Sequence, residues 1–346
     1  MNPQWKTFLQ QRGAQISDQD RVRFPKPEEP KACALCDLSD LGWIEVSGRD
    51  AGQFLQGQLT NDVRELSDSH AHLSAHCTPK GRMLAIFRVL RLGDTFLLQL
   101  PRSLVASTLQ RLQFFVLRAQ VKLRDISDEY ASFGLMGDQA ESLLSPHFDL
   151  SSTRDFWPSE AGILLQIPGP TLRFQLLGPP ESMMALWKEL EPEANPREGN
   201  FWSLLDIRAG LPWIYPETRE AWVPQMVNLQ RIDGVSFTKG CYTGQEIVAR
   251  MQYLGKLKRR MYWAEVETDQ PVVPGQALHA PSSRSEQATG RVVSAQQIAP
   301  DRWELLAVVE IQTAEAGDVY LGEGGPCLRL APPPYGFDEV QQTESA

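Results

Sequence analysis

The sequence predicts an α+β protein with a separate C-terminal antiparallel β-barrel. Up to residue 254, strand-like and helix-like runs alternate, without the long regular helices of a doubly wound parallel sheet. After Gly255 the runs become short, apolar and closely spaced, with turn residues such as Pro274-Gly275 between them, which is typical of a small barrel. The chain has 346 residues, 42% of them hydrophobic, which is enough for two or three domains.

The individual elements follow from the spacing of apolar residues. Apolar and β-branched runs predict strands, and apolar residues three and four apart predict helices. Before residue 254, the predicted strands are 41–46, 83–92, 95–100, 121–126 and 171–177, and the predicted helices are 103–117, 180–190 and 200–208. In the C-terminal domain, the predicted strands are 260–266, 291–295, 303–311, 318–321 and 327–330.

A faint internal repeat predicts two related α/β lobes. Gly48 is followed at fixed offsets by Phe54-Leu55, and Gly137 is followed at the same offsets by Leu143-Leu144. In both places a strand ends at the glycine and a helix begins with an acidic residue nearby, where the helix dipole favours negative charge. Other strand-to-helix turns share this pattern, but we favour a true pair of lobes.

Both chain ends are predicted to be flexible tails. Residues 1–32 are polar and end in the proline-rich, charged stretch 25–30, and residues 332–346 start with three prolines and become acidic. This division leaves residues 33–254 for the two lobes and residues 255–331 for the barrel.

Composition also limits the location and the partners. The net charge of −9 argues against a general binder of polyanions, because phosphate contacts need a surplus of Lys and Arg. The start at Met1 leads into no apolar run, and no later run is long enough to cross a bilayer. Five scattered cysteines suit reduced thiols rather than a disulfide framework. We therefore expect a cytoplasmic monomer without a membrane association.

One cysteine stands in a context that favours reactivity. Thr243-Gly244-Gln245-Glu246 has the form of a capping box and predicts a helix of about three turns that begins at Gly244 and ends at a left-handed Gly255. Cys241 then lies just outside the helix N-terminus with Lys239 nearby, and both features favour the thiolate. Gly240 leaves room for a ligand. We predict Cys241 and Lys239 as catalytic residues, the alternative being a small buried cysteine at a loop–helix junction.

Other candidate sites carry weaker signals. The motif Cys33–Cys36 is half of a zinc site without a second pair, and the group His70 to Cys77 fits no metal-binding spacing. We interpret that group as a polar surface loop and predict no metal site. Residues 246–260 contain five cations against Glu246 alone. This segment is a candidate contact for nucleic-acid phosphates or for the carboxylates of a bound ligand, although we slightly favour a solvated face.

The segment Lys239-Gly240-Cys241-Tyr242-Thr243-Gly244-Gln245-Glu246 resembles the signature of the YgfZ family, folate-dependent proteins of iron–sulfur assembly and tRNA modification. That family is in turn similar to the T-protein of glycine cleavage, a tetrahydrofolate-dependent aminomethyltransferase. Further blocks that resemble the family are 43–50, 54–63, 75–83, 207–212 and 224–229.

The resemblance implies a T-protein-like fold of three domains around a central channel that holds folate (tetrahydrofolate). Trp43 and Trp202 match family tryptophans that line the folate site, and an indole is a good partner for a flat pterin ring. The alternative for each tryptophan is ordinary core packing. The implied function is assistance in assembly or repair of iron–sulfur clusters, and thereby tRNA modification. Its partners would be client or assembly proteins, with tRNA contacted only indirectly or weakly.

The chain departs from the T-protein at one important place. Where the T-protein has a Gly-Gly-x-x-Asp-Asp type segment with its catalytic carboxylate, this chain has Lys80-Gly81-Arg82-Met83-Leu84-Ala85. Aminomethyl transfer needs an acid or base beside the folate nitrogen, so we do not expect this activity. The sequence leaves open whether the chain is an enzyme that acts through Cys241. The alternatives are a non-catalytic folate-binding scaffold that docks a partner protein and, less favoured, a folate-dependent methyl- or aminomethyltransferase.

Overall fold

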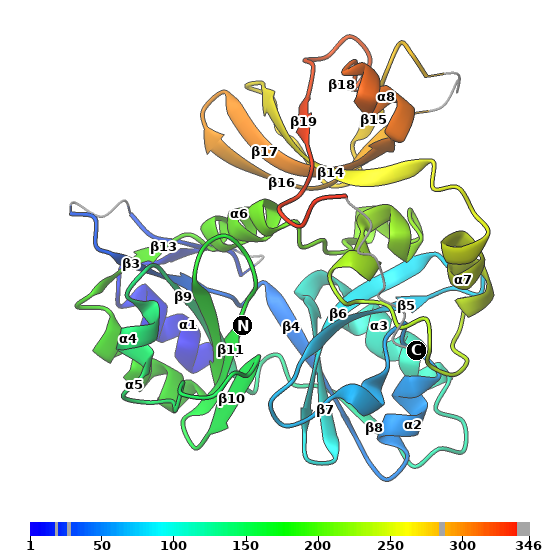
Figure 1. Ribbon diagram of the computed structural model, residues 1–346. Coiled ribbons are helices and arrows are strands. Elements are labelled where there is room, and N and C mark those ends of the chain that lie inside the picture. The colour runs from blue at the N-terminus through cyan, green and yellow to red at the C-terminus, as the bar shows by residue number, and fades with distance from the viewer. Residues whose placement is uncertain (18–19, 26–28, 284–287, 338–346) are drawn as a thin grey trace.

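The computed structural model describes residues 1–17, 20–25, 29–283 and 288–337. In it, two α/β lobes lie side by side, and a curled C-terminal sheet lies across one end of both (Figure 1). This arrangement confirms the predicted α+β class. None of the described helices is long and apolar enough to cross a membrane.

The first lobe is built on a five-stranded antiparallel sheet with the order β5-β6-β7-β4-β8. Its apolar runs form strands because they alternate across the two faces of the sheet, and helix α3 packs on β4, β7 and β8. The elements are β4 (Leu41–Ser47), α2 (Ala51–Gln56), η1 (Val63–Glu65), β5 (His72–Cys77), β6 (Met83–Leu92), β7 (Thr95–Pro101), α3 (Arg102–Phe114) and β8 (Lys122–Asp125).

The second lobe repeats this plan with one inserted strand. Its sheet has the order β10-β11-β12-β9-β3-β13, so that β3 (Cys33–Asp37) separates β9 from β13 and pairs with β13 in parallel. The other elements are β9 (Ala131–Met136), α4 (Ala140–Leu144), β10 (Phe156–Ser159), β11 (Gly162–Gln166), β12 (Arg173–Gly178), α5 (Pro180–Leu190) and β13 (Ala194–Arg197).

Equivalent turns confirm that the two lobes are related. Gly48 after β4 and Gly137 after β9 have φ of +112° and +123°, a backbone conformation that favours glycine. Pro101 and Pro179 are the N-caps of α3 and α5, with ψ of 130° and 138°. The repeat that the sequence shows around the two glycines therefore extends to the whole strand order.

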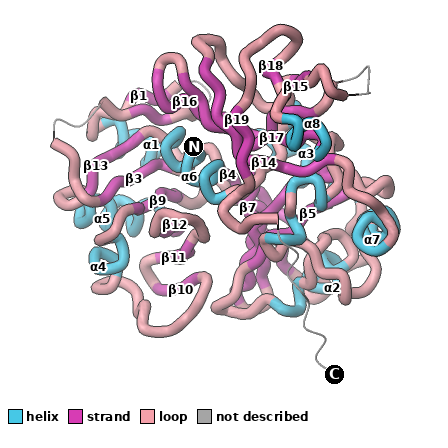
Figure 2. The backbone as a smooth tube through the Cα atoms, turned by 45° about the horizontal axis from the view of Figure 1, so that its top comes forward, coloured by secondary structure: helices cyan, strands magenta, loops and turns pink. Residues whose placement is uncertain are grey.

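The C-terminal domain is a curled, six-stranded antiparallel half-barrel with the order β18-β15-β16-β17-β14-β19. Figure 2 shows it beside the helical connection from the lobes. That connection contains α6 (Gly199–Ala209), η2 (Pro216–Thr218), η3 (Pro224–Val227), η4 (Leu229–Arg231) and α7 (Gln245–Tyr253). The domain contains β14 (Arg259–Glu267), β15 (Ala277–His279), β16 (Gly290–Ala299), β17 (Arg302–Glu310), α8 (Ile311–Ala316), β18 (Tyr320–Leu321) and β19 (Arg329–Ala331).

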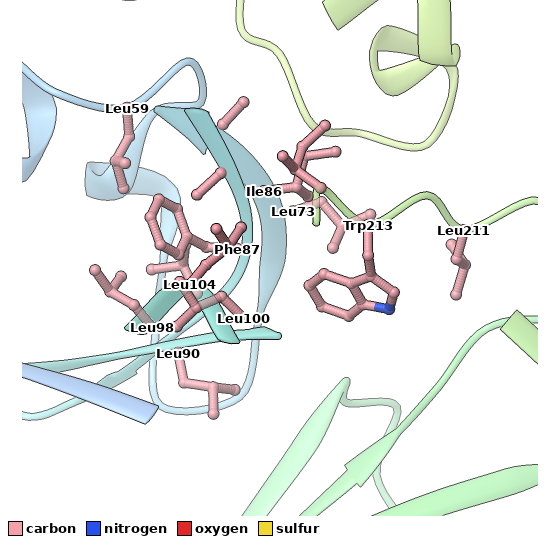
Figure 3. Packing of buried hydrophobic residues seen from close by; sticks show 14 of the residues in the cluster. Leu59, Leu73, Ile86, Phe87, Leu90, Leu98, Leu100, Leu104, Leu211 and Trp213 are labelled. Atoms are coloured by element: carbon pink, nitrogen blue, oxygen red, sulfur yellow. The ribbon is translucent and has the colours of Figure 1, made fainter. Parts of the chain in front are cut away.

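The two faces of the first sheet have different neighbours. Figure 3 shows Phe87 packed with Leu104 of α3 on one face, and Ile86 and Leu73 turned toward Trp213 on the other. The alternation of strand side chains places one apolar set under the helices and the other against the connection between the lobes. We refer to this second face as the inner face.

The N-terminal segment is not a flexible tail throughout, in contrast to our expectation for residues 1–32. Helix α1 (Pro3–Gln10) buries Trp5 completely, and the Trp5 indole donates a hydrogen bond of 2.6 Å to Asp37. The short strands β1 (Gln15–Ile16) and β2 (Val22–Arg23) pair with each other. The spacing of Trp5, Phe8 and Leu9 at i, i+3 and i+4 is typical of an amphipathic helix. Our expectation of a tail was based on the polar composition of the segment and overlooked this spacing.

The C-terminal segment is partly packed as well. The Tyr335 hydroxyl donates to the carbonyl of Gly210 at 3.0 Å, and the Phe337 ring lies edge-on to Tyr262. The rest of the predicted tail, residues 338–346, lies outside the described residues. The other domain boundaries stay predictions.

Candidate functional site

Lys239 is buried, and its ammonium fastens the loop before α7 to the first lobe. Its Nζ donates to the carbonyls of Gln56, Leu59 and Asn61 at 2.9, 2.6 and 2.8 Å. Burial lowers the pKa of Lys239 to about 8. The sequence predicts Lys239 as a helper of the Cys241 thiol, but the structure places its ammonium on three carbonyl oxygens, which is a positioning role.

Neighbouring hydrogen bonds join the same two segments. The Thr60 hydroxyl donates to the Gly234 carbonyl at 2.7 Å, the Asn61 amide donates to the Asp233 carbonyl at 2.7 Å, and the Ser236 backbone N–H donates to the Thr60 carbonyl at 3.0 Å. The blocks around residues 59–62 and 233–243 therefore form one structural unit.

The start of α7 is built by close glycine packing instead of a capping box. Gly244 is the N-cap with φ +87°, and no side chain caps the helix. A Cβ at Gly244 would lie 2.4 Å from the Thr78 carbonyl oxygen, and Gly81 (φ +68°) faces it from the β5–β6 turn. The predicted helix start is confirmed, whereas the predicted cap by Thr243 is wrong. Gly255 also lacks the left-handed φ that we expected.

Cys241 lies on the open surface of this unit. Its side chain is exposed, and no atom lies within 4 Å of the position that a Cβ on Gly240 would take. The alternative of a buried junction cysteine is therefore excluded. Cys77 is buried in β5, where burial raises the pKa of its thiol to about 12. Cys33 and Cys36 are buried too.

His72 and His76 of the first lobe are core residues, which corrects our interpretation of the group His70 to Cys77 as a polar surface loop. The His70 side chain stays 45% exposed, beside the Asp155 carboxylate. His72 and His76 lie in β5, and burial lowers their pKa values to about 3 and about 4. The His76 Nδ1 lies 3.1 Å from the Gln58 carbonyl oxygen. Within the part of the chain that the structure describes, no three His, Cys, Asp or Glu side chains form a group that could hold a metal ion.

A second group of polar residues lies on the inner face. Arg88, Gln99 and Trp43 are directly opposite one another on β6, β7 and β4, so their side chains share one row. All three are buried. Arg88 Nε, Gln99 Nε2 and Trp43 Nε1 have no hydrogen-bond partner among the residues that the structure describes. We call these three residues the donor row.

Arg88 is the unusual member of the donor row. Its guanidinium makes no ion pair or hydrogen bond with any other described residue. Burial lowers the pKa of Arg88 to about 10, and the Asp206 carboxylate of α6 opposes this effect. Sequence reasoning missed Arg88 and Gln99, although a polar residue that interrupts an apolar strand was an available signal. A buried cation without a partner lowers the stability of the folded chain. A ligand with acceptor atoms would remove this destabilisation by pairing with the donor row.

Trp202 comes from α6, in the connection that follows the second lobe, and is tightly packed. A Cβ at Gly134 would lie 2.2 Å from the Trp202 ring, and the Arg173 guanidinium is 4.9 Å from the ring centre. Arg173 pairs with Asp206 at 2.8 Å, and the Trp213 indole donates to Asp206 at 3.0 Å. Trp43 and Trp202 belong to the same buried cluster, but the contacts of Trp202 are those of core packing.

Known proteins resemble this chain over almost its whole length. Residues 29–161 match the GCVT N-terminal domain. A "tRNA-modifying protein YgfZ" from Cronobacter sakazakii is 32% identical over 330 residues, which cover 92% of this chain and 98% of the relative. This chain belongs to the YgfZ family. Another YgfZ protein, from Colwellia psychrerythraea, is 32% identical over 301 residues, 86% of this chain and 88% of the relative.

The YgfZ chain also shares its fold with a solved aminomethyltransferase. The glycine cleavage system aminomethyltransferase T from Bartonella henselae aligns with a TM-score of 0.77 at 16% identity, covering 97% of this chain and 98% of that chain. This likeness confirms the predicted T-protein-like fold. In this YgfZ chain, Leu84 and Ala85 are buried apolar residues of β6, at the positions where our comparison with the T-protein expects acidic residues.

Proposed function

We propose that this YgfZ-family chain binds a reduced folate against the donor row and acts in tRNA modification by assisting assembly or repair of iron–sulfur clusters in client enzymes. The name of its relatives supports the link to tRNA modification. The GCVT domain match and the aminomethyltransferase fold support folate. The observation that carries the proposal is the donor row, in which three adjacent buried nitrogens lack acceptors.

The chemistry of the donor row fits a folate. All three unpartnered atoms are donors, and a folate offers acceptors in its pterin carbonyl and ring nitrogens, its benzoyl carbonyl and its glutamate carboxylates. The flat Trp43 indole suits contact with an aromatic ring system. Arg88 would hold an acceptor or a carboxylate, because charge-assisted hydrogen bonds are the strongest that it can form.

The buried donor row and the exposed Cys241 thiol have different roles in this proposal. A bound reduced folate supplies a one-carbon unit or electrons, and the residues of the donor row bind and orient it. Leu84 and Ala85 offer no acid or base in β6. Cys241 is exposed, so its thiol is accessible to the iron–sulfur cluster of a client as substrate.

Calorimetric titration with tetrahydrofolate tests the folate part of the proposal. Trp43→Phe keeps an aromatic ring but removes one donor, so we expect about fivefold to tenfold weaker binding. Trp157→Phe is the matched control, because the Trp157 indole nitrogen is also buried without a partner but lies in the outer core of the second lobe. A wild-type chain that does not bind, or equal weakening in the control, contradicts the proposal.

A second candidate function is a non-catalytic folate-binding scaffold. It is favoured because all three hydrogen bonds of the Lys239 ammonium go to backbone carbonyls, and because positions 84 and 85 carry apolar residues instead of acids. Cys241→Ala separates the two candidates when expressed in a strain without the chromosomal gene. We expect this variant to bind tetrahydrofolate but to lose tRNA modification, measured by mass spectrometry of tRNA nucleosides. Modification at the wild-type level would favour the scaffold.

A further inference from the structure

The outer side of α7 and the residues directly after it expose apolar and basic side chains. We define the α7 surface as Arg250, Tyr253, Leu254, Lys256 and Lys258. Tyr253 and Leu254 are 67% and 85% exposed. The opposite side of the helix is anchored by the fully buried Val248. Together with the Phe237 ring beside Tyr253, the Tyr253 and Leu254 side chains form an exposed apolar group of the kind found at interaction sites.

The α7 surface lies beside Cys241. The Phe237 and Tyr253 rings are 6.0 Å apart at the C-terminal end of α7. At the other end, the Gln245 side chain donates to the Lys239 carbonyl at 3.4 Å. The 237–241 loop therefore runs along the helix, which is about 13 Å long, and ends at the exposed thiol. In Figures 1 and 2, α7 lies at the periphery of the molecule, on the side away from the second lobe.

The cations of the α7 surface are unpaired. In the described part of the chain, Arg250, Lys256 and Lys258 have no ion pair, side-chain hydrogen bond or ring contact. The next two cations differ, because Arg259 pairs with Glu310 at 3.0 Å and Arg260 lies over the Phe337 ring. Three positive charges thus flank two exposed apolar side chains in the sequence, within a chain whose net charge is −9.

We propose that the α7 surface docks the client protein through an apolar patch ringed by acidic side chains, and that docking brings the client to Cys241. This inference rests on the proposed function, since Cys241 is the accessible thiol of that function. An apolar centre with a polar rim is the usual anatomy of a protein–protein interface. Complementary charges would orient the client as it approaches.

The composition of the surface favours a protein over RNA. Leu254 is its most exposed apolar residue, and an aliphatic side chain is buried by apolar groups but offers no ring for a base to stack on. The one aromatic ring of the surface, that of Tyr253, already packs edge-on with Phe237. Three cations are few for a long polyanion, which the negative charge of the rest of the chain repels.

Photo-crosslinking tests the occupant in living cells. The full chain carries benzoylphenylalanine in place of Leu254 in a strain without the chromosomal gene. We expect a covalent adduct that ribonuclease does not shorten, in which mass spectrometry finds peptides of an iron–sulfur protein, and that disappears in the Arg250→Glu, Lys256→Glu, Lys258→Glu triple variant. Val273, an exposed apolar residue at 52% in the C-terminal domain, is the control position and should give no such adduct. A ribonuclease-sensitive adduct, an adduct with a second copy of this chain, or no adduct overturns the proposal.

Charge reversal tests the function of the surface. We expect the triple variant to lower tRNA modification at least tenfold, while its tetrahydrofolate affinity stays within twofold of wild type. The matched control reverses three exposed cations outside the α7 surface, Arg23, Lys122 and Arg291, and should keep full modification. Full modification in the α7 variant overturns the docking proposal. Absence of folate binding in the wild-type chain would instead contradict the proposed function and leave the crosslinking result standing.

Discussion

At the scale of single residues, Lys239 holds together two segments that are about 180 positions apart in the chain, since its ammonium reaches the carbonyls of Gln56, Leu59 and Asn61. Lys239→Met would leave these carbonyls without a charged donor. We expect the free energy of unfolding to fall by about 3 kcal/mol, measured by urea denaturation. Unchanged stability would show that other contacts hold the loop.

The same lysine gives stability a specific pH dependence. Burial lowers the pKa of Lys239 from 10.5 to about 8 in the folded chain. Between these pH values the unfolded chain binds the extra proton, so the free energy of unfolding contributed by this group rises with pH. Urea denaturation of wild type and Lys239→Met across this range isolates the effect. Parallel curves for the two proteins would contradict the assignment.

Two glycines of the signature segment allow a matched test of packing. Gly244→Ala would combine a left-handed φ with a contact of 2.4 Å to the Thr78 carbonyl oxygen, so we expect a loss of about 2–3 kcal/mol in stability. Gly240→Ala adds a methyl group where no atom lies within 4 Å and should change stability by less than about 0.5 kcal/mol. Thermal unfolding of both variants is the measurement, and equal effects would rule out this account.

At the scale of elements, α1 belongs to the core of the second lobe. The Trp5 ring stacks on Phe133 and meets the Trp187 ring edge-on. Trp5→Ala should therefore lower the free energy of unfolding by about 3–5 kcal/mol. Gln10→Ala in the same helix is the control, because Gln10 is exposed, and should have little effect. If urea denaturation shows similar midpoints for both variants, α1 is not part of the cooperative core.

At the scale of the whole molecule, the donor row predicts opposite effects on stability and binding. Arg88→Met removes a buried cation that has no partner in the structure, and replacing such a charge by an apolar side chain is often neutral or stabilising. We expect the thermal midpoint without ligand to be equal or higher, and tetrahydrofolate binding to weaken at least tenfold. A lower midpoint together with unchanged binding would assign Arg88 a purely structural role.

Much of the fold could be predicted from local patterns. The strand 83–92 and the helix 180–190 were predicted with the bounds that the structure shows, because apolar periodicity is strong there. The cap at Thr243 was predicted wrongly, since a Thr-x-x-Glu pattern does not reveal that Gly244 must pack against the backbone of Thr78. A contact between residues so far apart in the chain cannot be predicted from the local sequence pattern.

The sequence by itself determined the fold class, the two related lobes and the helix that follows Cys241. These features depend on periodicity and on neighbours within a few residues. Only the tertiary structure decided that the Lys239 ammonium donates its hydrogen bonds to backbone carbonyls and that Cys241 is exposed. The same holds for the shared row of Arg88, Gln99 and Trp43. The physical reason is that hydrogen-bond satisfaction and burial depend on which strands and loops meet in space, and those partners come from distant parts of the chain.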